Sequence, residues 1–167
     1  MNKLKLLVLS LGLILLITSC KKSDSQNHDI LMNGAPASQA SEWKTVSNWI
    51  SAKGEEFTSY YSRIEDTTIT NSVANSGLVL AFTKNGNGIY TLPFEEKGTK
   101  DFWHYQIHKG AITFSLDDYS TKQSLTTTGF KYYVFTPEKL KDLEAKGHSK
   151  IELIKLSYEN VTAILSK

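Results

Sequence analysis

Two histidines four residues apart, His104 and His108, come closest in type and spacing to a chemical site. Imidazole nitrogens bind transition metals and serve as general acids or bases near neutral pH. The alternating pattern around them predicts a strand, in which both side chains share a face but lie about 13 Å apart, at roughly 3.3 Å per residue. One ion cannot bind both, so a site would need a further ligand from elsewhere. We interpret them as solvated residues of a weak ligand surface.

Acidic doublets are a second source of chemistry. Paired carboxylates act as general acid and base only where different surroundings separate their pKa values, and these doublets fall in predicted exposed turns: Glu55-Glu56, Glu65-Asp66, Glu95-Glu96 and Asp117-Asp118. Asp117-Asp118 could bind Ca²⁺ with loop carbonyls, but no spaced series of oxygen ligands accompanies it. We predict no metal site.

Motifs for nucleophilic or phosphate chemistry are absent from the sequence. It contains no Gly-x-Ser-x-Gly elbow and neither of the two glycine-rich phosphate loops. We therefore predict that the protein is not an enzyme, has no catalytic residue and needs no cofactor. A metal-dependent or hydrolytic enzyme that uses His104 or His108 stays as the last alternative.

The chain has one cysteine, Cys20, which follows an apolar N-terminal segment. Lys3 and Lys5 precede the largely apolar residues 6–17, and the small residues Thr18 and Ser19 follow. This order is typical of a secretory signal peptide, and the run is shorter than the roughly 20 apolar residues of a membrane span. A single cysteine excludes an intrachain disulfide and a multi-cysteine zinc site.

The residues Ile17-Thr18-Ser19-Cys20 resemble a bacterial lipobox. The resemblance implies cleavage between Ser19 and Cys20, and it implies that Cys20 then carries a thioether-linked diacylglycerol and an acylated amine. Two or more acyl chains give stable membrane anchoring. We therefore expect a lipoprotein of the bacterial cell envelope, anchored at the outer membrane. Residues 21–24 loosely resemble surface-export tags of Bacteroidota lipoproteins, which leaves both faces of that membrane open.

Charge argues against nucleic acid as a partner. Removal of residues 1–20 would remove Lys3 and Lys5 and no acid, which leaves 17 basic and 17 acidic residues. Tracking a phosphate backbone needs clustered lysine and arginine, and Arg63 is the sole arginine. The expected partners are the membrane, through the lipid, and an envelope protein or polysaccharide.

The remaining sequence divides into a tether and one domain. Residues 21–40 are polar and small, which predicts a flexible tether, although Ile30-Leu31-Met32 could add a short edge strand. Residues 41–167 have the length of a single domain.

Alternation of apolar and polar residues predicts about eight strands in this domain. The Asn-Gly pairs of residues 85–88 tolerate the positive φ angles of a hairpin turn, and a second hairpin turns at Lys109-Gly110. In its first strand Trp103 lies on the face opposite the two histidines. The predicted strands are residues 42–51, 56–64, 77–84, 89–94, 101–108, 111–116, 129–137 and 151–156.

Capping residues predict three short helices. Thr70 and Gly77 bracket residues 71–76, Thr136 precedes a helix that opens on Pro137 and ends at Gly147, and Ser157 caps residues 158–165. Without regular alternation of strands and helices, this content favours a mainly β fold, a single two-layer antiparallel β-sandwich.

The order of these motifs resembles a group of small lipoproteins and secreted proteins common in Bacteroidota. The resemblance covers residues 43–165, and Lys131 stands where that group usually has arginine. It implies the β-sandwich fold and an envelope location, and no particular reaction. The matching residues are Ile69-Thr70, Gly77, Leu92-Pro93-Phe94, Gly110 and Gly129-Phe130.

Aromatic residues are the last group of candidates for a ligand-binding surface. Tyr132 and Tyr133 point to opposite faces of one predicted strand, so we expect one of them, Tyr133, to reach a ligand surface. Rings that share one exposed face could stack on sugars, whereas most rings of a sandwich lie in its core. Our first interpretation is a lipid-anchored envelope protein with a non-enzymatic binding or structural β-domain, and the alternative is a carbohydrate-binding module.

Overall fold

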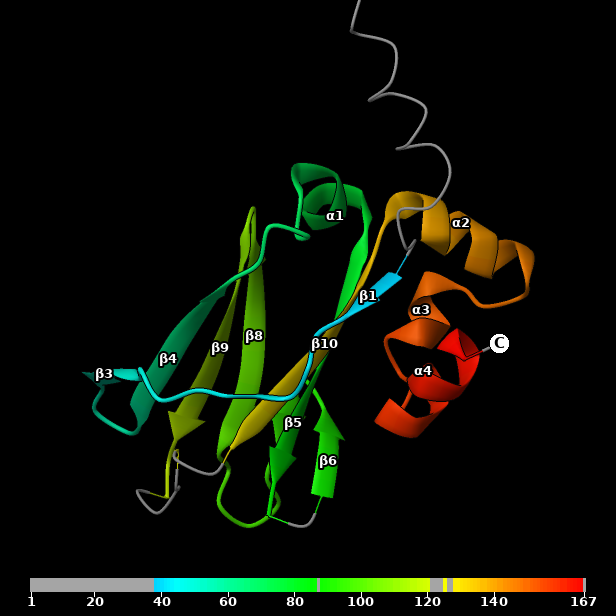
Figure 1. Ribbon diagram of the computed structural model, residues 1–167. Coiled ribbons are helices and arrows are strands. Elements are labelled where there is room, and N and C mark those ends of the chain that lie inside the picture. The colour runs from blue at the N-terminus through cyan, green and yellow to red at the C-terminus, as the bar shows by residue number, and fades with distance from the viewer. Residues whose placement is uncertain (1–37, 87, 121–124, 126–127, 167) are drawn as a thin grey trace, which may run out of the picture. The chain divides into compact units, whose positions relative to one another are not determined.

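The computed structural model describes residues 38–86, 88–120, 125 and 128–166. Ser19 and Cys20, the signal peptide and most of the tether lie outside the described residues. Within the described part, the chain forms ten strands and four helices (Figure 1). The prediction of a mainly β, two-layer antiparallel sandwich is confirmed.

The first sheet, sheet A, has the strand order β1-β10-β5-β6, and β2 pairs with β10 as well. The strand β1 falls in the last residues of the predicted tether, and it pairs with β10 in antiparallel register. The predicted hairpin between β5 and β6 is confirmed, with Gly86 at φ +56°. The strands are β1 (Ser38–Ala40), β2 (Lys44–Thr45), β5 (Leu78–Asn85), β6 (Gly88–Thr91) and β10 (Gly129–Phe135).

The second sheet, sheet B, has the strand order β3-β4-β9-β8-β7. The hairpin between β8 and β9 is confirmed, and Gly110 turns it at φ +75°. Leu92 and Pro93 carry the chain from β6 to β7 and so from one sheet to the other. The strands are β3 (Ile50–Lys53), β4 (Thr58–Glu65), β7 (Phe94–Glu95), β8 (Phe102–His108) and β9 (Ala111–Asp118).

The main core lies between the two sheets. Strand β9 contributes the alternate residues Ile112, Phe114 and Leu116, each fully buried. Phe114 stacks on Phe130 of β10 with ring centroids 4.2 Å apart, and Trp103 of β8 packs beside them. The alternation read from the sequence therefore assigns the inner face of sheet B correctly.

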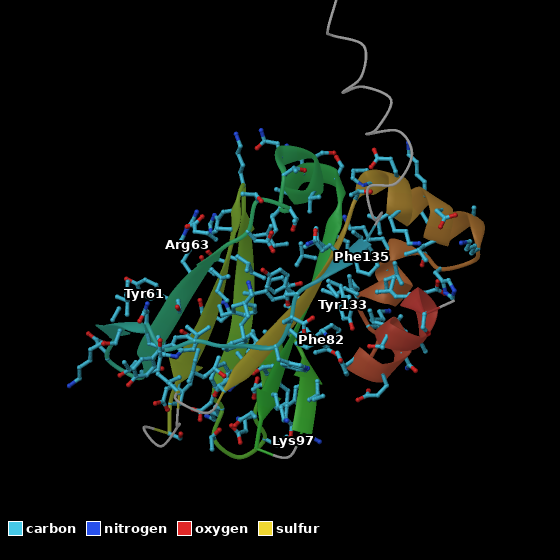
Figure 2. The ribbon with its side chains drawn as sticks, in the orientation of Figure 1. Tyr61, Arg63, Phe82, Lys97, Tyr133 and Phe135 are labelled. Atoms are coloured by element: carbon cyan, nitrogen blue, oxygen red, sulfur yellow. The ribbon has the colours of Figure 1, made fainter. Side chains whose placement is uncertain are left out.

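Three helices cover the other face of sheet A (Figure 1). They are α2 (Pro137–Ala145), α3 (Lys150–Leu153) and α4 (Tyr158–Leu165). Phe82, Tyr133 and Phe135 point from sheet A into this helical layer (Figure 2). The central strands of sheet A, β5 and β10, are consequently buried on both faces, and β5 is buried at six successive residues. In the part of the chain that is described, no helix is long and apolar enough to cross a membrane.

Helix caps follow the sequence closely at three helices. The Thr70 hydroxyl accepts a hydrogen bond at the start of α1 (Asn71–Ser76), and Thr136 and Ser157 do the same for α2 and α4. The predicted strand at residues 151–156 is wrong, because α3 occupies this region. Ser149 and Glu152 form a reciprocal capping box, which satisfies backbone N–H groups at the helix start.

Candidate functional site

The outer face of sheet B is the part of the sandwich that no described helix covers (Figure 1). We call it the open face. Figure 2 shows Tyr61 and Arg63 pointing away from the helical layer on this side of the molecule. Its members alternate with the buried residues of the same strands: Ser59, Tyr61 and Arg63 of β4, Thr113, Ser115 and Asp117 of β9, and Phe102, His104 and Gln106 of β8.

Strand register arranges these side chains in rows across the sheet. Tyr61 is opposite Ser115, which is opposite His104 on its other side. Strands lie about 4.8 Å apart, so Tyr61 and His104 stand about 10 Å apart with only a serine between them. Two more residues of β9 on this face, Ala111 and Thr113, are small too, and Asp117 lies on it as well. Ser115 and Ala111 are themselves buried, at 9% and 0% exposed.

Aromatic rings flank β9 on the open face. Tyr61 is 38% exposed, and Phe102 stacks on His104 with ring centroids 5.3 Å apart. Phe57, which precedes β4, contacts Tyr119, which follows β9, with centroids 4.9 Å apart, and Tyr119 is 39% exposed. Tyr61, Phe102 and His104 come from two strands, β4 and β8, and share the open face.

A buried carboxylate holds Tyr119 in place. Asp101 is fully buried and accepts hydrogen bonds from the backbone N–H groups of Tyr119 and Ser120, at 2.7 and 3.0 Å. The Ser120 hydroxyl donates to the same carboxylate at 2.7 Å. Charge-assisted bonds of this kind are about twice as strong as neutral ones. Tyr119 is consequently fixed to the framework through its backbone.

Hydrogen-bonding groups lie among the rings. The Ser59 hydroxyl donates to Asp117 Oδ1 at 2.6 Å, and His104 Nε2 lies 3.6 Å from Asp117 Oδ2. Arg63 donates to Glu65 at 2.7 Å, which pairs the charge of the guanidinium within the same strand. The open face thus combines flat apolar surfaces with oriented, mutually paired polar groups.

The two histidines share the open face, as the sequence predicts. His104 takes part in the Phe102 stack and lies beside Asp117, whereas His108 is exposed at the far end of β8. Within the described residues, no group of three or more histidine, cysteine, aspartate or glutamate side chains is placed to hold a metal ion. The structure therefore brings His104 into the candidate site and leaves His108 at its edge.

Tyr133 does not reach a ligand surface, and this prediction is wrong. The residue is 4% exposed and lies under the helical layer, where its hydroxyl is 2.9 Å from the Thr162 hydroxyl (Figure 2). Its neighbour Tyr132 is buried on the other face of β10. Both faces of this strand are covered, so neither tyrosine leaves the core.

The acidic doublets differ from one another in the structure. Glu55 and Glu56 are exposed in a bend, as predicted. Asp117 and Asp118 do not lie in an exposed turn, because they end strand β9, and Asp118 is buried. Its Oδ1 lies 3.2 Å from the Ser120 hydroxyl oxygen, beside the shorter bond from that hydroxyl to Asp101.

A polar cavity of about 490 Å³ lies beside Asp66, Tyr132 and Lys44. The Asp66 carboxylate accepts bonds from the Tyr132 hydroxyl at 2.6 Å and from the hydroxyl and N–H of Thr68 at 2.6 and 2.9 Å. Burial opposes ionisation of Asp66, but the bonds from Thr68 and Tyr132 and the charge of Lys44 outweigh it and lower the pKa.

The Asp66–Tyr132 pair is suited to a structural role. Burial, together with the hydrogen bond and charge of Asp66, raises the pKa of Tyr132, so the phenol stays protonated as a donor. A lowered carboxylate pKa and a raised phenol pKa leave neither group poised to exchange a proton near neutral pH. This pair links the end of β4 to β10 and so joins the two sheets.

Sequence reasoning missed most of the open face. The alternation of buried Ser62 with exposed Tyr61 and Arg63 could have assigned the face of each residue within β4. That alternation does not determine the order of the strands in the sheet, so the sequence could not predict the row that joins Tyr61 to His104.

Fold and face together define a β-sandwich with one covered sheet and one open, ring-bearing sheet. Comparisons with known protein families, with curated proteins and with solved structures give no match to this chain.

Proposed function

We propose that this protein is a lipid-anchored protein of the bacterial cell envelope whose β-domain binds a partner, without catalysis, through the open face. The observation that carries the binding proposal is the asymmetry of the sandwich: helices cover the outer face of sheet A, while the open face presents Tyr61 and neighbouring rings to solvent. Exposed aromatic residues beside oriented polar groups are characteristic of binding surfaces.

The proposed anchor rests on the amino-acid sequence. Lysines, an apolar run, small residues and a cysteine follow one another in the order of a lipobox, and Cys20 is the one cysteine of the chain. A covalent lipid at Cys20 would supply membrane attachment, since two or more acyl chains suffice for stable anchoring. Both faces of the outer membrane are compatible with this proposal.

The anchor is tested on the protein purified from a bacterial membrane. Mass spectrometry of the mature N-terminus should give Cys20 as the first residue, with the mass of a diacylglycerol thioether and an acylated amine. The Cys20→Ala variant should lose its partition into detergent in a phase-separation assay. An unmodified or uncleaved Cys20 would refute the anchor.

Binding is tested by pull-down from detergent-solubilised envelopes with the full-length chain. A partner of the open face, whether protein or polysaccharide, should be retained by the wild type and by Ile151→Ala, whose site lies on α3, and lost with Tyr61→Ala. Equal retention by all three proteins would assign the partner to another surface and overturn the proposal.

A further inference from the structure

We propose that α3 and its C-cap form a second membrane contact, by which the anchored domain rests on the phospholipid bilayer. The contact, which we call the α3 surface, consists of Ile151 and Ile154 with the flanking Lys150 and Lys155. This inference rests on the proposed lipid anchor, which brings the domain to a membrane. It is carried by the exposure of the two isoleucines, by the way α3 is held and by the place where the chain from Cys20 enters the domain.

The α3 surface exposes two isoleucines close together. Ile151 is 66% exposed, the largest exposed fraction of any large apolar side chain in the part of the chain that the structure describes. Ile154, the C-cap residue, is 47% exposed. Residues three apart lie on the same side of a helix, so the two side chains form one apolar patch.

The short helix is held firmly enough to present this patch. Leu153, which lies between the two isoleucines in sequence, is 1% exposed and belongs to the core beneath the helical layer. At the helix start Ser149 and Glu152 form the capping box, and the Lys150 ammonium group donates to the Gly77 carbonyl oxygen at 2.7 Å. Because Leu153 already fills the core position, the isoleucines stay in solvent.

Three contacts place α3 near the point where the chain from the anchor enters the domain. Ser38, the first described residue, pairs with Phe135 at the end of β10. A Cβ on Gly77 would lie 2.5 Å from the Phe135 carbonyl oxygen, so Gly77 packs directly against that strand. Lys150 of α3 is bonded to Gly77 in turn. Figure 1 shows the start of β1 on the same side of the domain as α3, and β3 on the opposite side.

The chain between the anchor and this entry point is short. Residues 21–37 number 17, and a flexible chain of that length has an r.m.s. span of about 20–25 Å. A domain of about 130 residues is roughly 35 Å across. The surface around Ser38 is therefore the part of the domain that is held nearest to the bilayer, at an effective concentration on the order of millimolar. At that concentration a small apolar patch suffices for contact.

Charge neither drives nor opposes this contact. The Glu152 carboxylate accepts bonds from the N–H and the hydroxyl of Ser149, at 2.9 Å each. A balanced helical layer attracts anionic lipids little, so apolar burial must carry the contact, while lysine side chains can extend their ammonium groups to the headgroups. Residues 136–166 contain five lysines and five acids, which are Lys139, Lys141, Lys146, Lys150 and Lys155 and Glu138, Asp142, Glu144, Glu152 and Glu159.

A protein partner fits the α3 surface less well than a bilayer does. Specific protein interfaces bury about 800 Å² on each partner, with about 20–30 residues. Two isoleucines bordered by charged side chains offer much less contiguous apolar area than that. Apolar helix faces, by contrast, enter the boundary between headgroups and acyl chains by about 5–10 Å, and a fluid surface adapts to a small patch.

The contact gives the anchored domain an orientation. The helical layer lies on the outer side of sheet A, and the open face is the outer side of sheet B. A domain that rests on α3 consequently turns the open face away from the bilayer. In this orientation the open face is accessible to the partner that we propose for it.

The test measures the depth of α3 in the lipidated protein, reconstituted through its own anchor into phosphatidylcholine vesicles. Cys20 is alkylated in that protein, so Ile151→Cys supplies a single free thiol for the fluorophore NBD. The matched control is Ile50→Cys, on β3 and 57% exposed. Nitroxide lipids should quench the fluorophore on Ile151→Cys about threefold or more over the control, because only α3 reaches the lipid. Phosphatidylglycerol or high salt should change this little, since apolar burial is not screened.

Substitutions at Ile154 show whether the apolar patch, and not the fluorophore alone, makes the contact. In the Ile151→Cys protein, Ile154→Asp should lower the quenching to the level of the Ile50→Cys control, because a carboxylate resists removal from water. Ile154→Leu keeps an apolar side chain and should leave the quenching within about 1.5-fold. Urea unfolding checks that both variants fold, and if Ile154→Asp does not, the comparison of the two labelled positions decides.

Several results would overturn the proposal. Equal quenching at Ile151→Cys and Ile50→Cys would do so, as would quenching that a folded Ile154→Asp variant retains or that high salt removes. A fluorophore shielded from water but not quenched by lipid would assign the α3 surface to a protein, and to a second copy if the shielding rises with the density of the chain on the vesicle.

Failure of this inference and failure of the anchor are distinguishable. Mass spectrometry of Cys20 tests the anchor separately, so any of these results leaves a lipidated protein in place. A chain without lipid that does not associate with vesicles would remove the anchor and this inference together. The envelope pull-down is made in detergent, without a bilayer, so Ile151→Ala stays a valid control for the open face there.

Discussion

The hydrogen bond between Tyr132 and Asp66 should make a larger and more pH-dependent contribution to stability than its neutral counterpart in the same core. Tyr132 donates to the Asp66 carboxylate at 2.6 Å, and Tyr105 donates to the backbone carbonyl of Val79 at 2.7 Å. The substitutions Tyr132→Phe and Tyr105→Phe remove one hydroxyl each and keep the ring. The two variants differ in the acceptor that loses its donor, which is the charged Asp66 carboxylate in one and the uncharged Val79 carbonyl in the other.

The magnitudes follow from that difference. A hydrogen bond to a charged group contributes about 1.5–3 kcal/mol and a neutral one about 0.5–1.5 kcal/mol. Tyr132→Phe should therefore lower the free energy of unfolding at pH 7 by about 2 kcal/mol, and Tyr105→Phe by about 1 kcal/mol. With a urea m-value of about 1–3 kcal/mol/M, the first loss moves the midpoint by about 1 M.

The pH dependence has a definite sign. The pKa of Asp66 is lowered in the folded state from its ordinary value of 3.8. Its stabilising effect is therefore complete above that value, and it is lost as the pH falls through the folded-state pKa. The difference in the free energy of unfolding between wild type and Tyr132→Phe should therefore shrink below about pH 4. It should approach the value for a hydrogen bond to an uncharged acceptor, about 1 kcal/mol.

Urea unfolding curves at pH 7 and at pH 2–3 test this reasoning, with Tyr105→Phe as the matched control. The difference in the free energy of unfolding between Tyr105→Phe and the wild type should stay constant with pH, because the Val79 carbonyl does not titrate. Two results would refute the assignment of a charged acceptor. One is an equal loss of unfolding free energy for both variants at pH 7, and the other is a loss for Tyr132→Phe that is the same in acid as at pH 7.

Three further predictions concern the framework, each measured by urea unfolding. Gly77→Ala should cost about 1–3 kcal/mol by overpacking, since a Cβ there would lie 2.5 Å from the Phe135 carbonyl oxygen; a neutral result would contradict the close approach. Ser149→Ala should cost about 1 kcal/mol, through loss of the cap of α3, and no loss would argue against the capping box. Leu153→Ala should cost about 2–5 kcal/mol, whereas Ile151→Ala should stay within about 0.5 kcal/mol, because these side chains are 1% and 66% exposed; similar losses would indicate a strand in place of α3.

Features set by local chemistry were predictable from the sequence. Thr70 and Ser157 lie at helix starts because their hydroxyls accept backbone N–H bonds there, and Gly110 turns a hairpin because it adopts positive φ without strain. The error at α3 was local too. Ile151, Leu153 and Ile154 suggested a strand, while Ser149 and Glu152 have the spacing of a capping box.

Features set by long-range packing were not predictable. Alternation assigns residues to the two faces of a strand, but it does not say which face another layer will cover. Tyr133 is buried because α4 packs over it, and Tyr61 is exposed because no described helix packs over sheet B. Each outcome depends on where a distant segment docks, and the open face could be found only once the strand order was known.

Strand β5 also has a consequence for the solubility of the nascent chain. Its first six residues, Leu78 to Thr83, carry no charge and no proline, a composition typical of segments that stack into cross-β aggregates. In the folded protein both faces of this segment are buried. Apart from Trp43, the residues that cover the face bearing Phe82 come from α2, α3, α4 and Leu156, all later in the chain than β5 (Figure 2). During synthesis the segment therefore emerges before most of its cover, and we expect the helical layer to protect against aggregation as well as to complete the core.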